Sequence, residues 1–102
     1  MKPHSKDFSE QNFSNCKFEG QNLYGANFEG ANLEGVNFTL CTLTKANFKN
    51  ANLKNAKFDL SSVMKADFEG ANIEGAIFYG AGYHLAYNLK YEDPAVVVEI
   101  NS

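Results

Sequence analysis

The sequence predicts an all-β solenoid, a quadrilateral β-helix of about four 20-residue coils, followed by a short C-terminal capping helix. Three observations support this fold. A large apolar residue recurs at every fifth position, and in most units a small residue lies two positions before it and glycine or asparagine two positions after it. The pattern repeats again at a spacing of twenty residues.

The period of five excludes the two regular secondary structures. On an α-helix each step of five would rotate the side chain by about 140°, so the apolar residues would surround the helix. On a flat strand, successive residues of this series would point to opposite faces. A chain that turns a corner after each unit instead presents all of them to one interior. The predicted core is Phe8, Phe13, Phe18, Leu23, Phe28, Leu33, Phe38, Leu43, Phe48, Leu53, Phe58, Val63, Phe68, Ile73 and Phe78.

The residues that flank each core residue indicate where it points and where the chain turns. Side chains alternate in direction along each side of a coil, so the residue two positions before each core residue also points inward. Small residues fit there beside the large ones. Glycine and asparagine tolerate positive φ, so the residues two positions later are the predicted corners. The small inward residues are Ala26, Ala31, Ala46, Ala51, Ala56, Ala66, Ala71 and Ala76. The corners are Asn15, Gly20, Gly25, Gly30, Gly35, Asn50, Asn55, Gly70, Gly75 and Gly80.

The spacing of twenty sets four units to a coil. Residues 23–38, 43–58 and 63–78 align at this spacing. Stacking then gives two inner columns of phenylalanine and two that are mostly aliphatic. Coils about 4.8 Å apart also bring outward residues into contact. Two outward columns alternate in charge, and a third is all asparagine: Glu29, Lys49, Glu69; Glu34, Lys54, Glu74; and Asn12, Asn32, Asn52, Asn72.

The units "ANFEG", "ANLEG", "ANFKN", "ANLKN", "ADFEG" and "ANIEG" resemble the pentapeptide-repeat family over about residues 6–82. The resemblance implies a β-helix that is right-handed. Three segments depart from the pattern. "TLCTLTK" and "DLSSVMK" place Leu40 and Leu60 at corners, and "AIFYG" places Ile77 and Tyr79 where polar residues are usual. These departures predict an apolar outer strip that consists of Leu40, Leu60, Met64, Ile77 and Tyr79. Either the C-terminal tail folds over this strip, or the strip contacts another subunit or a partner.

The two ends of the chain fall outside the repeat. Residues 1–5 are expected to be a flexible N-terminus, and residues 6–82 the β-helix. Residues 83–93 read as a capping helix that ends before Pro94, with Leu85 and Leu89 on its buried face. Residues 94–102 are an extended tail, which could pair with an edge of its own chain or of a second copy. The few residues before Phe8 cannot cover the first coil, which makes that end a candidate docking surface.

No catalytic or metal-binding arrangement is found. His4 and His84 lie at no fixed spacing from a nucleophile or a second ligand, and Cys16 and Cys41 occupy inward positions that small residues usually fill. The net charge of −3 disfavours nucleic-acid and membrane binding. The N-terminus lacks the apolar run of a secretory signal. We therefore expect a bacterial, cytoplasmic protein with reduced thiols and no cofactor.

These features favour a non-catalytic structural or protein–protein interaction module with an unknown protein partner, rather than an enzyme. A homodimer through a coil end or through the tail stays open. The alternative comes from the resemblance, since quinolone-resistance relatives act on type II topoisomerases such as gyrase by imitating DNA. Interleaved lysines and a short rod fit that role poorly. Ice binding is weaker still, because Thr39, Thr42 and Thr44 lie in one coil.

Overall fold

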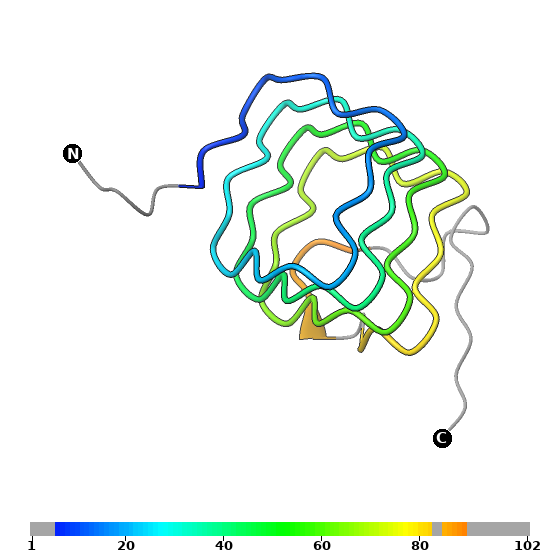
Figure 1. Ribbon diagram of the computed structural model, residues 1–102. Helices are drawn as coiled ribbons and strands as arrows, with labels where there is room; N and C mark the ends of the chain where they lie inside the picture. Colours follow the sequence, from blue (N-terminus) through cyan, green and yellow to red (C-terminus); the bar gives the residue numbers. More distant parts are fainter. Residues whose placement is uncertain (1–5, 83–84, 90–102) are drawn as a thin grey trace.

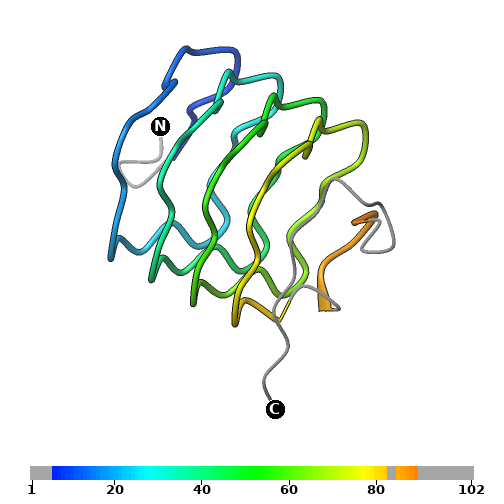
Figure 2. The ribbon, with the colours of Figure 1, turned by 90° about the vertical axis from the view of Figure 1, so that its right-hand side faces the viewer.

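The computed structural model describes residues 6–82 and 85–89 of the chain. The backbone winds around a single interior, and successive coils stack along one axis (Figure 1, Figure 2). Within the described residues there is no regular strand and no α-helix. Each side of a coil instead contributes one residue to an isolated parallel β-bridge with the next coil.

The bridges join residues twenty apart, which is the register that the sequence predicts. One ladder runs from Asp7 through Asn27, Asn47 and Asp67 to Tyr87. Backbone hydrogen bonds follow the same register: the N–H of Asn47 donates to the carbonyl of Ala26 at 2.9 Å. Because each coil satisfies the backbone groups of its neighbours, the stack is held along its whole length.

The corners have the predicted backbone conformation. At the turns from Phe13 onward the N–H after the corner donates back three residues, as from Cys16 to the carbonyl of Phe13 at 2.9 Å. The third residue of the turn then needs positive φ, and Asn15 has a φ of 62°. Glycine and asparagine were predicted here, but other residue types adopt the same conformation. These are Glu10, Leu40, Lys45, Leu60 and Lys65.

The asparagine before each core residue has a local structural role. The side-chain Oδ1 of Asn47 accepts the backbone N–H of Lys49 at 2.9 Å, which starts the turn. Along the predicted asparagine column, Asn32 donates to Asn12 at 3.1 Å and Asn52 donates to Asn32 at 3.3 Å. These amides therefore fix both the corner and the register between coils.

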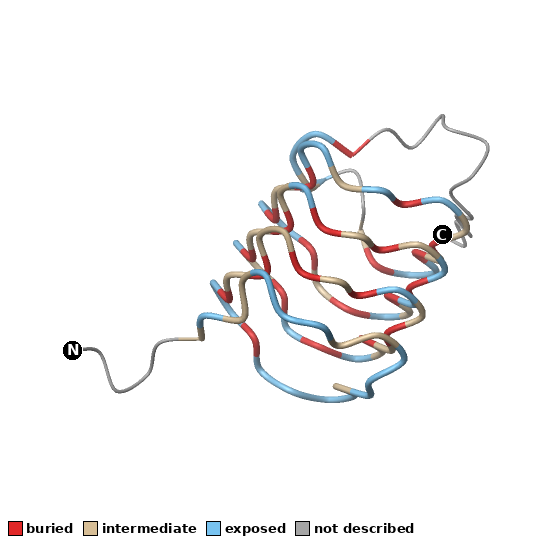
Figure 3. Cartoon of the chain, turned by 90° about the horizontal axis from the view of Figure 1, so that it is seen from above, coloured by how far each residue is buried: buried red, intermediate tan, exposed pale blue. Residues whose placement is uncertain are grey.

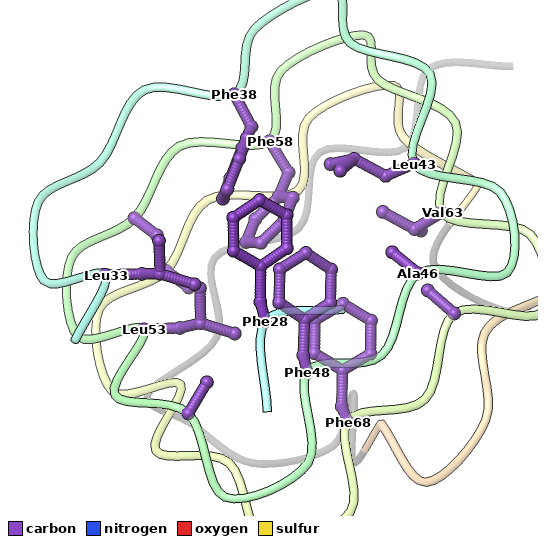
Figure 4. Packing of buried hydrophobic residues seen from close by; sticks show 14 of the residues in the cluster. Phe28, Leu33, Phe38, Leu43, Ala46, Phe48, Leu53, Phe58, Val63 and Phe68 are labelled. Carbon is purple, nitrogen blue, oxygen red and sulfur yellow. The ribbon is translucent and has the colours of Figure 1, made fainter. Parts of the chain in front are cut away.

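The interior consists of stacked side chains in columns (Figure 4). Phe28, Phe48 and Phe68 form one column, with 5.4 Å and 5.0 Å between successive ring centroids. Phe38 and Phe58 stack on another side and meet the first column edge to face. Core residues from Leu23 to Phe78 are buried, and buried positions recur along these coils (Figure 3). Phe8, Phe13 and Phe18 in the first coil are only partly buried.

The prediction of a capping helix is wrong for residues 85–89. Tyr87 continues the bridge ladder with Asp67, and the N–H of Lys65 donates to the carbonyl of Leu85 at 2.8 Å. Pairing with the open edge of the last coil satisfies backbone groups that a helix would leave unpaired. Leu89 is buried as predicted, whereas Leu85 is 46% exposed. The rest of the predicted helix, the N-terminus 1–5 and the tail 94–102 lie outside the described residues.

Candidate interaction surface

Two leucines form an exposed apolar corner. Leu40 and Leu60 occupy the same corner of successive coils, where they are 60% and 54% exposed. Both have positive φ, 61° and 58°. Their backbones stay in the ladder, since the Leu40 N–H donates to the backbone carbonyl of Asp59 and the Leu60 N–H donates to the backbone carbonyl of Tyr79. The leucine side chains are therefore presented to solvent by a regular, hydrogen-bonded backbone.

Tyr79 and Ile77 extend this apolar surface into the next coil. Tyr79 is 39% exposed and lies in the turn directly above the one that carries Leu60. The Cδ2 of Leu60 lies over the backbone of Gly80, 2.8 Å from where a Cβ at that residue would stand. Ile77 forms the bridge with Lys57 on the adjoining side and is partly buried. We call Leu40, Leu60, Ile77 and Tyr79 the corner strip.

Met64 was predicted to belong to this surface, but it lies at the far end of the neighbouring side. Met64 occupies the next corner, in the same turn position as Tyr24, and the two are 43% and 50% exposed. The Nζ of Lys45 lies 5.8 Å from the centre of the Tyr24 ring. Tyr24 was missed because it falls at a turn position that charged residues usually occupy. Its spacing of forty from Met64 was the signal that could have found it.

A carboxylate borders the corner strip. Asp59 immediately precedes Leu60 in the turn, and its Oδ1 is shielded from solvent without a hydrogen-bond partner among the described residues. A buried carboxylate oxygen without a donor is energetically unfavourable.

The surface charges are interleaved along the stack. The predicted columns of alternating charge stand in register, as the backbone bonds from Gly30 to Lys49 and from Asn50 to Glu69 show. The ion pair found among the described residues lies across columns, between Lys49 Nζ and Asp67 at 3.9 Å. An exposed pair of this kind contributes little to stability. The charges keep the outer faces polar and do not form an acidic surface.

The two cysteines differ in environment, although both were predicted to be buried. Cys41 is buried, and its Sγ donates to the carbonyl of Phe18 at 2.9 Å. Burial raises the pKa of the Cys41 thiol. Cys16 is exposed because no described coil covers the first one on that side. Among residues 6–82 and 85–89 there is no cluster of three metal-ligating side chains; His4 and His84 lie outside this part.

This difference predicts two classes of thiol reactivity. A thiol reagent should modify Cys16 rapidly, because this thiol is exposed to solvent. Cys41 should react only as fast as the coil opens, since its thiol is shielded and held neutral. Time-resolved labelling of the wild type should show one fast and one slow site. In the control variant Cys16→Ser, only the slow site should remain. Equal rates would contradict the burial of Cys41.

The repeat itself identifies the family. The family model of pentapeptide repeats matches the chain in eight copies, over residues 7–39, 22–59 and 36–80. The chain belongs to the pentapeptide-repeat family. No curated protein matches it. Within the described residues, no helix is long and apolar enough to cross a membrane.

Solved structures of pentapeptide-repeat proteins are similar to the chain. A protein from the thylakoid lumen of Arabidopsis thaliana is 30% identical with a TM-score of 0.63, over 72% of this chain and 55% of that one. The chain thus spans about half the length of that relative. A protein from Nostoc Pcc 7120 is 24% identical with a TM-score of 0.64, over 93% and 86% of the two chains. QnrB1, a plasmid-mediated fluoroquinolone resistance protein, is 25% identical with a TM-score of 0.54, over 81% and 51%.

Proposed function

We propose that the chain is a non-catalytic protein–protein interaction module, a right-handed quadrilateral β-helix of about four coils that contacts its partner through the corner strip. The observation that carries this proposal is the pair Leu40 and Leu60. Both side chains are more than half exposed, and both residues have positive φ. Positive φ is common to all the corners, but leucine is not required there, since glycine or asparagine occupies ten other corners of the repeat.

The energetic argument compares a leucine with the residues that usually form these corners. A left-handed conformation costs a non-glycine residue about 1–2 kcal/mol. Contact with the neighbouring coil buries somewhat less than half of each leucine, which returns a similar amount at about 25 cal/mol per Å². The leucines therefore add little net stability, while they expose apolar surface to water. A role in binding accounts for residues that the fold does not require.

The chemistry of the strip indicates what the partner presents. The leucines, Ile77 and Tyr79 suit an apolar contact that excludes water. We therefore expect a protein partner with an apolar patch.

Affinity capture from the source cells tests this proposal with two matched variants. Leu40→Gly/Leu60→Gly removes the two leucine side chains of the strip and relaxes the backbone, so loss of folding does not confuse the result. Asn50→Gly/Asn55→Gly makes the same change at two polar corners with φ of 59° and 62°. The first variant should lose the captured protein, and the second should retain it. Capture that is equal for both variants would rule out the corner strip as the working surface.

The alternative, a DNA mimic that acts on a type II topoisomerase such as gyrase, is motivated by the similarity to QnrB1. Imitation of DNA requires dense negative charge along the rod. Lys49 and Lys54 interrupt the glutamate columns here. A molar excess of the chain should leave gyrase supercoiling unchanged, and inhibition or protection from fluoroquinolones would favour the alternative instead.

A further inference from the structure

The first coil carries an unpaired backbone edge. In the second coil, Asn27 uses both its backbone groups toward the first: its N–H donates to Lys6 at 2.8 Å, and its carbonyl accepts the N–H of Phe8 at 2.7 Å. The equivalent residues of the first coil are Asp7, Asn12 and Lys17. Their backbone N–H and carbonyl groups point the same way, and none has a hydrogen-bond partner among residues 6–82 and 85–89.

The fourth side of this coil is partly closed by the chain itself. The Nζ of Lys6 donates to the backbone carbonyl of Asn22 at 2.7 Å. The open edge therefore runs along three consecutive sides, those that carry Asp7, Asn12 and Lys17. Figure 2 shows this coil, in blue, at one end of the stack.

Inside this edge lies an apolar surface. Phe8, Phe13 and Phe18 are only partly buried, and the ring centroid of Phe13 lies 5.6 Å from that of each of the other two. Phenylalanine at residue 13 stands in a column that is otherwise aliphatic. The end of the solenoid thus presents three rings beside backbone groups that have no partner among the described residues, and both features favour a partner.

The amides of the second side also run toward this end. Asn52 donates to Asn32, and Asn32 donates to Asn12. The Oδ1 of Asn12 additionally accepts the backbone N–H of Ser14 at 3.0 Å. The Nδ2 of Asn12 is the next donor of the ladder and has no partner among the described residues. A further asparagine in this register would accept it.

The charges of the edge distinguish one partner. Asp7 and Lys17 lie on opposite sides of the coil, with Asn12 on the side between them. Two copies that meet end to end, about a twofold axis through the Asn12 side, would place each Asp7 opposite Lys17 of the other copy. The same axis places Asn12 opposite Asn12. An axis through the Asp7 side would instead oppose like charges on two sides, which is unfavourable.

We propose that the first coil pairs with the first coil of a second copy, head to head and antiparallel, through Asp7, Asn12 and Lys17. Residues that direct both backbone groups to the edge form the doubly hydrogen-bonded pairs of an antiparallel ladder. The N–H and hydroxyl of Ser9 bond the Asp7 carboxylate, which lowers its pKa and keeps it charged at neutral pH. Only another coil of this cross-section matches three sides at once. A single extended peptide would pair with one side.

The test measures molar mass by light scattering and sedimentation over a roughly hundredfold range of concentration. The wild-type chain should shift from monomer to dimer, and the shift should weaken at high salt. Lys17→Asp places like charges opposite each other and should remain monomeric, with unchanged circular dichroism. Asp7→Lys should behave in the same way. A mixture of these two variants restores both charge pairs and should form a heterodimer that neither forms alone.

Three results would overturn the proposal. These are a wild-type chain that stays monomeric over the whole range, a Lys17→Asp variant that dimerises like wild type, and a mixture of variants that fails to associate. A dimer that persists in the charge variants and is lost in Leu40→Gly/Leu60→Gly would assign self-association to the corner strip instead.

Discussion

Replacement of Phe48 by alanine should lower the free energy of unfolding by about 3–5 kcal/mol, the range for loss of a buried aromatic ring. The Phe48 ring lies between Phe28 and Phe68 in its column and meets Phe38 and Phe58 edge to face at 5.7 Å each. Backbone hydrogen bonds join this coil to the coil before it and to the coil after it. The backbone therefore cannot move inward to fill the cavity that the substitution leaves. Denaturant unfolding followed by circular dichroism measures the change.

Phe8→Ala is the matched control for this prediction. Phe8 belongs to the same column, but it stacks on one ring only, Phe28 at 5.0 Å, and is partly buried. The decrease in the free energy of unfolding should be clearly smaller for Phe8→Ala than for Phe48→Ala. Equal losses at the two positions would mean that stacking within the column does not determine the stability of the core.

Replacement of Ala46 by leucine should destabilise the chain by about 1–3 kcal/mol or more, as overpacking of a filled core does. Ala46 is 1% exposed and lies in the interior beside Phe48 (Figure 4). Its backbone is fixed by bonds to Leu43 and Asp67, at 3.0 Å each. The side therefore cannot move outward to admit the larger side chain.

The control for Ala46 is Ala71→Leu, at an inward position that is only partly buried. There the added methyl groups can extend toward solvent, so we expect a smaller loss of stability. Thermal unfolding of both variants provides the comparison. A leucine that is tolerated equally well at both positions would show that the small inward residues are not required by the width of the coil.

The sequence alone was sufficient for the repeat. The period of five determines which residues lie in the core and which lie at corners. The spacing of twenty determines which residues pair between coils, and the β-bridges have that register. It was insufficient where tertiary pairing competes with a local pattern. Residues 85–89 have helical periodicity, but the open edge of the last coil needs hydrogen-bond partners, and Tyr87 supplies one to Phe68.

The candidate surface was only partly predictable for a related reason. Leu40 and Leu60 break the corner rule visibly, so the sequence reveals them. The place of Met64 and Tyr24 on the surface depends on which corner each turn residue faces. The burial of the Asp59 oxygen depends on how its neighbours shield it. The exposure of Cys16 depends on the absence of a described coil beyond it. None of these properties follows from the residue types alone.

The unfolding free energy of Leu40→Gly/Leu60→Gly tests most directly whether the corner strip exists for binding rather than for folding. Glycine relieves about 1–2 kcal/mol of left-handed strain at each corner but is more flexible in the unfolded chain by about 0.5–1 kcal/mol. Together with the lost contacts, these contributions nearly cancel. We predict a value within about 2 kcal/mol of wild type. A loss of about 3 kcal/mol or more, in the range of a core residue, would contradict the account.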